Sequence, residues 1–518
     1  MEKRKFYLAF LIAAAVLLSG GCRFPGSSDH PPGYLVVGIE SNPLDLDPRY
    51  ATDANSVRID ALIYNSLLRV DDKLRLRPEL ASEWKMTDER TYVFELRKHV
   101  KFHNGKTMTA RDVKYTYESM LEPRNHSPKR PLLKALEAVD ELDTYKVRFR
   151  LSVPHAPFPE QFTIGIVPAR SNGIETPGAK IPPGSGPFML DTIDRGESIT
   201  LKANPSYWEE KAQLAGIIFK VVPDAMVRAL EFKKGTIDFL QNDLEPDMLP
   251  WLKKNTHAVF DAHEGTTFQY IGANLNHPIL KNREVRQAIA LAIDRDSIIR
   301  HLLKGFATPA SGLLSPIHWA YNGSVPQWSF NPEKAKRLLD DAGYPDPDGA
   351  GPLPRFRLSF KTTNLDLRKR IAEALKEQLA RVGIELEIRT YEWGTFYSDI
   401  KKGNFHLYSL AWVGVMDPDI YYQMFHSASI PPNGDNRGHY SNFEVDRLLE
   451  QGRRTTDAAE REAVYIQVQR ILADELPAIP LWWVKNVTVQ NAAIKGFVPY
   501  PDGDLISLKT VSLQNQLP

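Results

Sequence analysis

Residues 100–113 read VKFHNGKTMTARDV. Within this stretch Thr109 stands directly before a run of helix-forming residues, and Asp112 follows three positions later. That spacing is typical of a capping box, in which two side chains satisfy backbone N–H groups at the start of a helix. The stretch therefore predicts a helix over residues 110–121.

The segments around this helix predict strands. Residues 92–96 and 146–151 alternate apolar and polar side chains, as half-buried strands do, and residues 217–222 form a run rich in β-branched side chains. Farther along, residues 367–382 carry apolar side chains at helical spacing, and residues 384–388 alternate again. This mixture of strands and helices predicts an α/β protein with helices packed on sheets.

The composition is that of an ordinary globular protein. The chain has 518 residues, 42% of them hydrophobic, and 65 basic side chains balance 64 acidic ones. A balanced charge argues against nucleic acid as a partner, because nucleic-acid binding needs a basic face.

Motifs for catalysis or cofactor binding are missing from the sequence. Gly105-Lys106-Thr107 lacks the first glycine of a phosphate loop, which would fall at Val100, and neither HExxH nor CxxC occurs. We therefore expect no cofactor and no metal site. A hydrolase whose two carboxylates lie far apart in the sequence is the distant alternative.

The N-terminus predicts export. Basic residues 3–5 precede an uncharged run over 6–18, which is too short to span a bilayer and is typical of a signal peptide. Small residues then lead to Cys22, the only cysteine, in LLSGGC, which resembles a bacterial lipobox. We expect a signal peptide over 1–21, lipid on Cys22 and a tether over 22–33. Plain secretion with an idle thiol is the alternative.

The chain from about residue 34 to about residue 513 resembles the bacterial extracellular solute-binding proteins of family 5, which are the oligopeptide, dipeptide and nickel receptors of ABC importers. The stretch at 100–113 is the most recognisable part of this resemblance. The other segments that carry it, in chain order, are 44–48 (LDLDP), 63–68 (IYNSLL), 80–84 (LASEW), 184–188 (GSGPF), 204–208 (NPSYW), 285–288 (VRQA) with 292–295 (AIDR), 331–344 and 417–419 (DPD).

This resemblance implies a two-lobed, periplasmic-binding-protein-like α/β fold of the large, three-subdomain type II variety, with two crossovers between the lobes. Lobe 1 is expected to comprise residues 34–267 and 485–518, with a subdomain over about 72–168. Lobe 2 is expected to span 268–484. In such a fold the ligand is enclosed in the cleft as the lobes close.

The resemblance also implies a function, which is that of the substrate-binding component of an ABC importer. Such a receptor captures peptides of the oligopeptide or dipeptide class and delivers them to an inner-membrane permease. Such a receptor is expected to be a monomer and not to be an enzyme. It is expected to face the periplasm or the cell exterior and to contact the membrane only through its lipid. A non-peptide solute, either an oligosaccharide or a metal chelate, is the alternative ligand, and a surface-anchored hydrolase is the distant alternative function.

One departure from the family bears on the ligand. In the peptide-binding members a Trp-x-x-Asp segment supplies the carboxylate that pairs with the peptide's α-amino group, but residues 412–419 read WVGVMDPD and place Val415 there. A buried ammonium facing valine would lack a partner. We therefore expect either that Asp417 takes over the role through a shifted loop or that the ligand has no free amine. Asp417 could equally cap the turn before Pro418.

Six further residues are candidate ligand contacts. Lys361 and Arg437 are candidate cations for the carboxylate end of a peptide, with a solvated loop arginine as the simpler interpretation of Arg437. Trp393 and Trp412 are candidate ligand contacts because they could stack on sugars, or they belong to the core. The remaining candidates, in segments that carry the resemblance, are Tyr64 and Ser185.

Overall fold

The structure, a computed structural model, describes residues 31–170, 181–242, 244–349 and 351–514. The predicted signal peptide over residues 1–21 and the predicted lipidation site Cys22 lie outside the described residues. Within the described ranges, no helix is both long and apolar enough to cross a bilayer.

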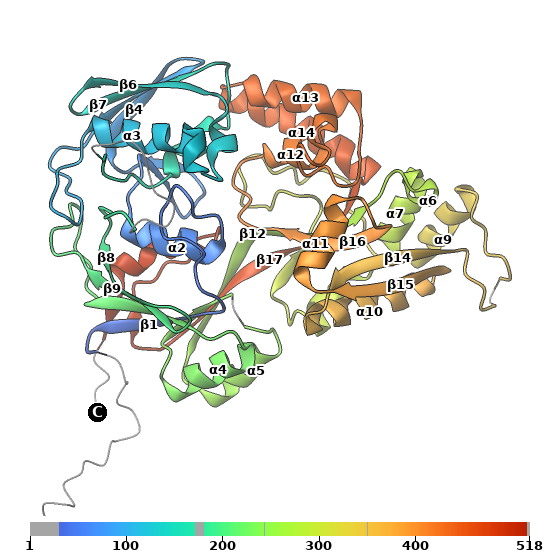
Figure 1. Ribbon diagram of the computed structural model, residues 1–518. Helices are drawn as coiled ribbons and strands as arrows, with labels where there is room; N and C mark the ends of the chain where they lie inside the picture. The colour runs from blue at the N-terminus through green and yellow to red at the C-terminus, as the bar shows by residue number, and fades with distance from the viewer. Residues whose placement is uncertain (1–30, 171–180, 243, 350, 515–518) are drawn as a thin grey trace, which may run out of the picture.

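One mixed sheet of eleven strands extends through both lobes of the described protein (Figure 1). Its order is β15-β14-β16-β12-β17-β11-β1-β10-β9-β8, and β13 pairs with β17 beside this path. The pairs of β1 with β10 and β11, and of β14 with β15 and β16, are parallel. The strands are β1 (Tyr34–Ile39), β8 (Phe188–Asp194), β9 (Ser198–Ala203), β10 (Gly216–Val221), β11 (Phe239–Gln241), β12 (Val259–Ala273), β13 (Ala307–Pro309), β14 (Phe356–Thr363), β15 (Ile384–Tyr391), β16 (Leu407–Trp412) and β17 (Ala478–Gln490).

The long strands β12 and β17 join the two lobes (Figure 1). Residues 259–263 of β12 pair with 486–490 of β17, residues 267–272 pair with 478–484, and the register shifts between the two stretches. β11 pairs with the C-terminal part of β17, whereas β16 pairs with the C-terminal half of β12. The two-lobed α/β fold with two crossovers is confirmed. The residue boundaries of the lobes stay a prediction, and "lobe 1" and "lobe 2" below refer to the predicted ranges.

A separate antiparallel sheet, ordered β4-β5-β7-β6, lies at the outer end of lobe 1 (Figure 1). Beside it the predicted helix is confirmed at residues 110–121, and the Thr109 N–H donates to the carboxylate of Asp112 (2.8 Å). Lys106 donates to the same carboxylate (2.6 Å), so the lysine of the GKT sequence serves a helix start. The elements here are β4 (Ala81–Asp88), β5 (Thr91–Leu96), α3 (Ala110–Leu121), η1 (Pro123–Asn125), η2 (Arg130–Leu133), β6 (Leu136–Asp143), β7 (Lys146–Leu151) and η3 (Phe158–Thr163).

The rest of lobe 1 packs around α2 (Ala54–Ile63), and the C-terminal segment returns to contact this helix through η5 (Ile506–Thr510). This return places residues 502–504 beside residues that are more than 400 positions earlier in the chain. The other elements are β2 (Leu68–Val70), β3 (Leu76–Pro78), α4 (Ala225–Lys234), α5 (Met248–Asn255), β18 (Ile494–Lys495) and β19 (Ser512–Leu513).

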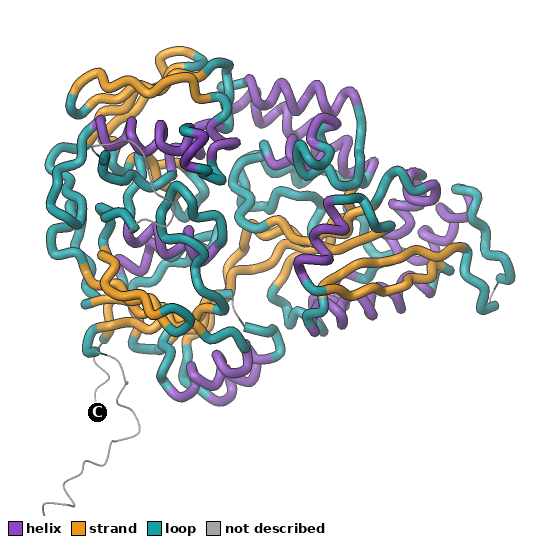
Figure 2. Tube along the Cα trace, in the orientation of Figure 1, coloured by secondary structure: helices purple, strands orange, loops and turns teal. Residues whose placement is uncertain are grey.

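Helices flank the strands of lobe 2 (Figure 2). The stripe predicted over residues 367–382 is confirmed in α10, which buries Ile371, Leu375 and Leu379 and packs on β14 and β15. Asp457 caps the long helix α14, where its side chain accepts from the Glu460 N–H. The helices are α6 (Pro278–Lys281), α7 (Arg283–Ala292), α8 (Arg295–His301), α9 (Pro332–Asp341), α10 (Asp366–Ala380), α11 (Trp393–Lys401), α12 (Ile420–Phe425), η4 (Ser427–Ser429), α13 (Phe443–Arg454) and α14 (Ala458–Glu475).

Candidate functional site

Besides the crossover strands, several contacts join the described parts of the two lobes, among them hydrogen bonds between Thr308 and Glu264 and between Lys485 and Phe306. The backbone N–H of Ala156, in the outer part of lobe 1, donates to the carbonyl oxygen of Arg453 at the end of α13 (2.7 Å). Elsewhere Asp247, just before α5, forms ion pairs with Lys304 (2.9 Å) and Arg370 (2.7 Å) of lobe 2. Cavities between these facing surfaces are therefore the candidate sites.

A cavity of about 220 Å³ lies between α2, the returning C-terminal segment and Met416 of lobe 2. We call it the lobe 1 cavity, because Met416 is its one lining residue from lobe 2 in the described part of the chain. Glu79 in its wall accepts hydrogen bonds from the Ser66 N–H (2.7 Å) and from Asn65 (2.9 Å). The charged residues that line the cavity are Asp60, Arg69, Glu79, Lys129, Asp502 and Asp504.

Asp60 is a buried acid without a partner. Its side chain projects from α2, the residue is 5% exposed, and neither carboxylate oxygen accepts a hydrogen bond from a described residue. Burial raises the pKa of Asp60 well above its usual range, although the charge of Lys129 opposes this shift. Burial and the charge of Asp502 likewise raise the pKa of Asp504 to about 7. The cavity wall thus brings together three acidic side chains, Asp60, Asp502 and Asp504, that form no ion pair with a described lysine or arginine.

Tyr64 and Ser185 are both held inside lobe 1. The Tyr64 hydroxyl lies 2.9 Å and 2.7 Å from the carbonyl oxygens of Leu46 and Pro182, although its ring lines the lobe 1 cavity. Ser185 is fully buried and donates to Asn65 (3.3 Å), so its side chain does not reach the cleft. The burial of Ser185 thus gives the predicted ligand contact no support.

The two glycines that flank Ser185 explain the loop geometry. A Cβ on either Gly184 or Gly186 would collide with the last backbone carbonyls of α2, around Ile63. The backbone of this loop therefore contacts the end of α2 directly, and only glycine fits at positions 184 and 186.

Arg437 and Trp412 form a pair on lobe 2. The guanidinium of Arg437 lies over the Trp412 ring (5.4 Å to the centroid) and donates to Asp435 (2.6 Å) and to the Tyr270 hydroxyl (3.2 Å). Two buried donors remain without a partner in the described chain, Nε of Arg437 and Nε1 of Trp412. Unpaired buried donors are costly, so this pair is a candidate site for a ligand oxygen.

Trp393 belongs to the same cluster. It is 54% exposed at the start of α11 and stacks on Tyr397, with ring centroids 5.4 Å apart and planes 12° apart. Tyr397 in turn lies under the guanidinium of Arg437 (5.5 Å). The structure therefore brings three of the predicted residues, Trp393, Trp412 and Arg437, onto one aromatic surface.

Asp417 lies in an ion pair within lobe 2. Its two carboxylate oxygens accept from the guanidinium of Arg461 on α14 (2.5 and 2.7 Å), and one of them also accepts from the Asp419 N–H (2.7 Å). Both side chains of the pair are about nine-tenths buried. A ligand amine would have to compete with Arg461 for this carboxylate, and the predicted role as amine partner stays a prediction.

Lys361 is also paired within lobe 2. Its ammonium contacts the carboxylate of Asp399 (2.5 Å) and lies over the ring of Tyr391 (5.0 Å). It lines a shallow pocket with His277 and His406, which shares no lining residue with the Arg437 cluster. Its predicted role at a carboxylate also stays a prediction.

A second cavity between the lobes, again of about 220 Å³, contains a cation that the sequence did not reveal. Arg368, near the start of α10, donates to the side-chain oxygen of Gln269 (2.6 Å) and forms no ion pair with any described carboxylate. Gln269 is fixed in turn by donating to Ser409 (2.7 Å). The cavity is otherwise mostly apolar, with walls from Leu240, Leu244 and Leu249 of lobe 1 and from Leu303, Phe306, Leu367 and Trp482 of lobe 2.

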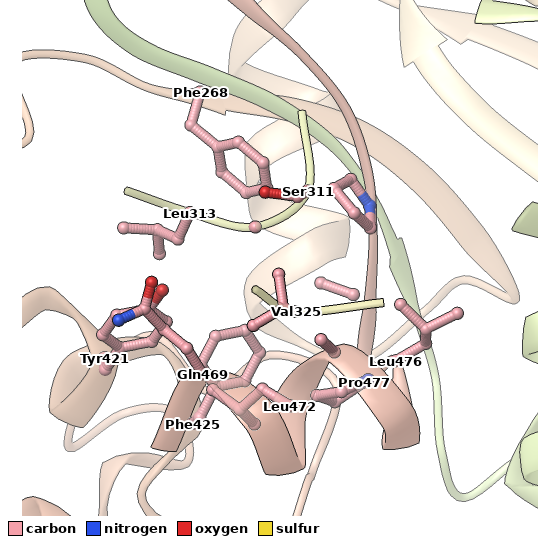
Figure 3. Close-up of a pocket in the computed structure, with 14 residues that line it drawn as sticks. Phe268, Ser311, Leu313, Val325, Tyr421, Phe425, Gln469, Leu472, Leu476 and Pro477 are labelled. Carbon is pink, nitrogen blue, oxygen red and sulfur yellow. The ribbon is translucent and has the colours of Figure 1, made fainter. Parts of the chain in front are cut away.

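Figure 3 shows a smaller pocket in which side chains such as Phe268, Leu313 and Tyr421 face one another. Its volume of about 30 Å³ is that of roughly one water molecule, and every lining residue belongs to lobe 2. This pocket is a packing space within lobe 2 and is too small for a solute.

Comparison with known proteins identifies the family. The model of the bacterial extracellular solute-binding proteins, family 5 (middle region), matches residues 75–432, which is more than half of the chain. The protein belongs to this family.

Relatives of this solute-binding protein match it along almost their entire length. The oligopeptide-binding protein AppA of Bacillus subtilis (strain 168) is 29% identical over 98% of this chain and 99% of its own, and the glutathione-binding protein GsiB of Escherichia coli (strain K12) is 29% identical over 96% and 97%. Among solved structures, AppA of Bacillus subtilis in complex with a nonapeptide has a TM-score of 0.78, at 29% identity and coverage of 93% and 99%. NikA of Brucella suis in complex with Fe(III)-EDTA has a TM-score of 0.85, at 25% identity and coverage of 94% and 100%.

Proposed function

We propose that this solute-binding protein captures peptides between its lobes and presents them, without chemical change, to the membrane permease of an ABC importer. AppA, which was solved with a nonapeptide, aligns over 93% of this chain, and DppA from Helicobacter pylori, solved with the peptide STSA, also aligns over 93%. A peptide offers a carboxylate, an amine and regularly spaced amide groups. The receptor would encounter its ligand as a monomer.

The observation that carries this proposal is the pair of unpartnered donors on lobe 2. Nε of Arg437 and Nε1 of Trp412 are both buried and lack an acceptor in the described chain, and the guanidinium lies over the indole ring. A peptide carboxylate or carbonyl oxygen would satisfy both, and lobe closure would strengthen the bonds by excluding water. The exposed ring of Trp393 extends the same surface with a flat apolar contact.

A non-peptide solute is the second candidate, and one observation favours it. Val415, which stands where the peptide-binding members have their amine-pairing carboxylate, is 6% exposed and packs in the apolar core of lobe 2. A carboxylate-rich chelate such as the ligand solved with NikA would use the Arg437 donors without needing an amine partner.

A peptide ligand is expected to stabilise the protein by about 2.7 kcal/mol when present at 100 times its dissociation constant, because only the folded state binds it. Thermal unfolding with peptide pools, an oligosaccharide panel and a Fe(III)-EDTA sample measures this effect. Stabilisation by peptides alone supports the proposal. Stabilisation by the sugars or the chelate alone would show that the ligand is that solute and not a peptide. Chemical conversion of any of these compounds by the protein would contradict the receptor role.

We also propose that Cys22 carries the lipid that anchors the exported protein. Cys22→Ser is expected to move the protein from the membrane fraction to the soluble fraction, while its affinity for peptides stays unchanged, because residue 22 precedes the folded lobes. Fractionation of cells that express either form measures the shift. A Cys22→Ser protein that stays in the membrane fraction would place the anchor elsewhere.

A further inference from the structure

Three acidic side chains of the lobe 1 cavity form no ion pair in the described chain, although the charge of Lys129 acts on Asp60 and that of Arg58 acts on Asp502 and Asp504. Asp60 on α2 accepts no hydrogen bond, and Asp502 and Asp504 accept only from N–H groups of their own loop, at Asp504 (3.0 Å) and Ile506 (2.7 Å). No ion pair joins any of the three to a described lysine or arginine, although Lys129 lines the same cavity.

The balance of charge in the cavity is negative. Its charged lining consists of four acids and two bases. Of these, Glu79 is satisfied by Ser66 and Asn65, and Arg69 is paired with Glu209 (3.1 Å). What remains in the lining is three acidic side chains and the ammonium of Lys129, while the guanidinium of Arg58, outside the lining, acts on Asp502 and Asp504.

A buried acid without a partner destabilises the fold, and a cation that binds beside it with good hydrogen-bond geometry offsets part of that cost. The described chain has no group of acidic, histidine or cysteine residues arranged to hold a metal ion. An organic cation with N–H donors fits this cavity instead, because both oxygens of Asp60 are free to accept. The cavity has room for a group the size of a side chain but not for a whole peptide.

We propose that the lobe 1 cavity binds a cationic group of the ligand, an ammonium or guanidinium, through Asp60 with Asp502 and Asp504 beside it. The protein then selects peptides that carry a positive charge at this position. This inference rests on the proposed peptide function and specifies its substrate class. The charge can come from the peptide's α-amine or from a lysine or arginine side chain.

The test uses defined peptide pools of three to six residues and native mass spectrometry of the whole exported protein. One pool carries lysine or arginine at a single position, a second carries acetyl-lysine or citrulline there, and both are also prepared N-acetylated. We expect retention of charged over uncharged peptides by about tenfold or more. If the lysine and arginine pool is retained no better than the acetyl-lysine and citrulline pool, the bound charge is not that of a side chain. If N-acetylation abolishes retention, the bound group is the α-amine.

Asp60→Asn is the deciding variant, because it keeps the shape of the side chain and removes the charge. We expect it to fold, since the neutral amide has nearly the same shape as the buried acid, and to lose most of the tenfold preference while it still retains uncharged peptides. Glu83→Gln, at an exposed position of β4, is the matched control and should keep the preference.

Each remaining outcome counts against the inference. If wild-type protein retains charged, uncharged and acetylated peptides equally, the cavity does not select cations, although the peptide function stands. If Asp60→Asn keeps the full preference, the cation binds elsewhere. If no pool is retained, the peptide function fails and the inference fails with it.

Discussion

Arg437→Lys is expected to weaken peptide binding by roughly 10- to 100-fold, or about 1.5–3 kcal/mol, which is the usual range for a hydrogen bond to a charged group. Lysine keeps a positive charge near Asp435 and Tyr270 but has no Nε–H. In the structure that N–H is buried, without a partner, over the ring of Trp412. Isothermal titration with a peptide from the retained pool measures the loss.

Two matched variants separate binding from folding. Trp412→Phe keeps an aromatic ring under the guanidinium but removes the second unpaired donor, so about a tenfold loss of affinity is expected. Arg447→Lys, on the exposed face of α13, should change neither stability nor affinity. If Arg437→Lys binds peptide as tightly as the wild type, the donor pair does not contact the ligand and the basis of the peptide proposal is lost.

Local sequence patterns predicted much of the fold, because periodicity and caps act over a few residues. The capping box at Thr109 and Asp112 marked the start of α3, and the apolar stripe over 367–382 predicted α10. The eleven-stranded sheet could not be predicted in this way. Its continuity depends on pairing between β12 and β17, which are separated by more than 200 residues.

The candidate site shows the same division. Arg437, Trp412 and Trp393 were predicted, and the structure brings them onto one surface through Tyr397. Asp60 was missed, because in the sequence it is one polar residue in an ordinary helix. Its significance arises only when the C-terminal segment, more than 400 residues later, closes the cavity around it.

Arg368 was missed for a related reason. In the sequence it is one of several basic residues near the start of a helix, where a solvated side chain is expected. In the structure it donates to Gln269 in the wall of the second interlobe cavity. Lobe 2 therefore presents donors in Arg368, Arg437 and Trp412, whereas the lobe 1 cavity presents acceptors. A ligand with opposite charges at its two ends complements both lobes at once.

Asp417 was predicted as the amine partner, but its ion pair with Arg461 leads to a different expectation. Arg461→Gln is expected to destabilise lobe 2 by about 3 kcal/mol or more, because it leaves the carboxylate of Asp417 buried and uncompensated. Urea denaturation measures the loss. Arg447→Gln, which breaks the exposed pair with Glu444 on α13, is the control and should have little effect.

Asp417→Asn decides whether Asp417 pairs with Arg461 or with the amine of a peptide. If the main role of Asp417 is to pair with Arg461, Asp417→Asn lowers the stability of the protein. The variant that carries both Asp417→Asn and Arg461→Gln then loses less stability than the sum of the two single changes. Affinity changes equally for a free peptide and its N-acetylated form. A loss of affinity confined to the free peptide would instead restore Asp417 as the amine partner. We expect the first result, because the carboxylate already accepts two bonds from Arg461 and one from the Asp419 N–H, whereas Asp60 accepts none.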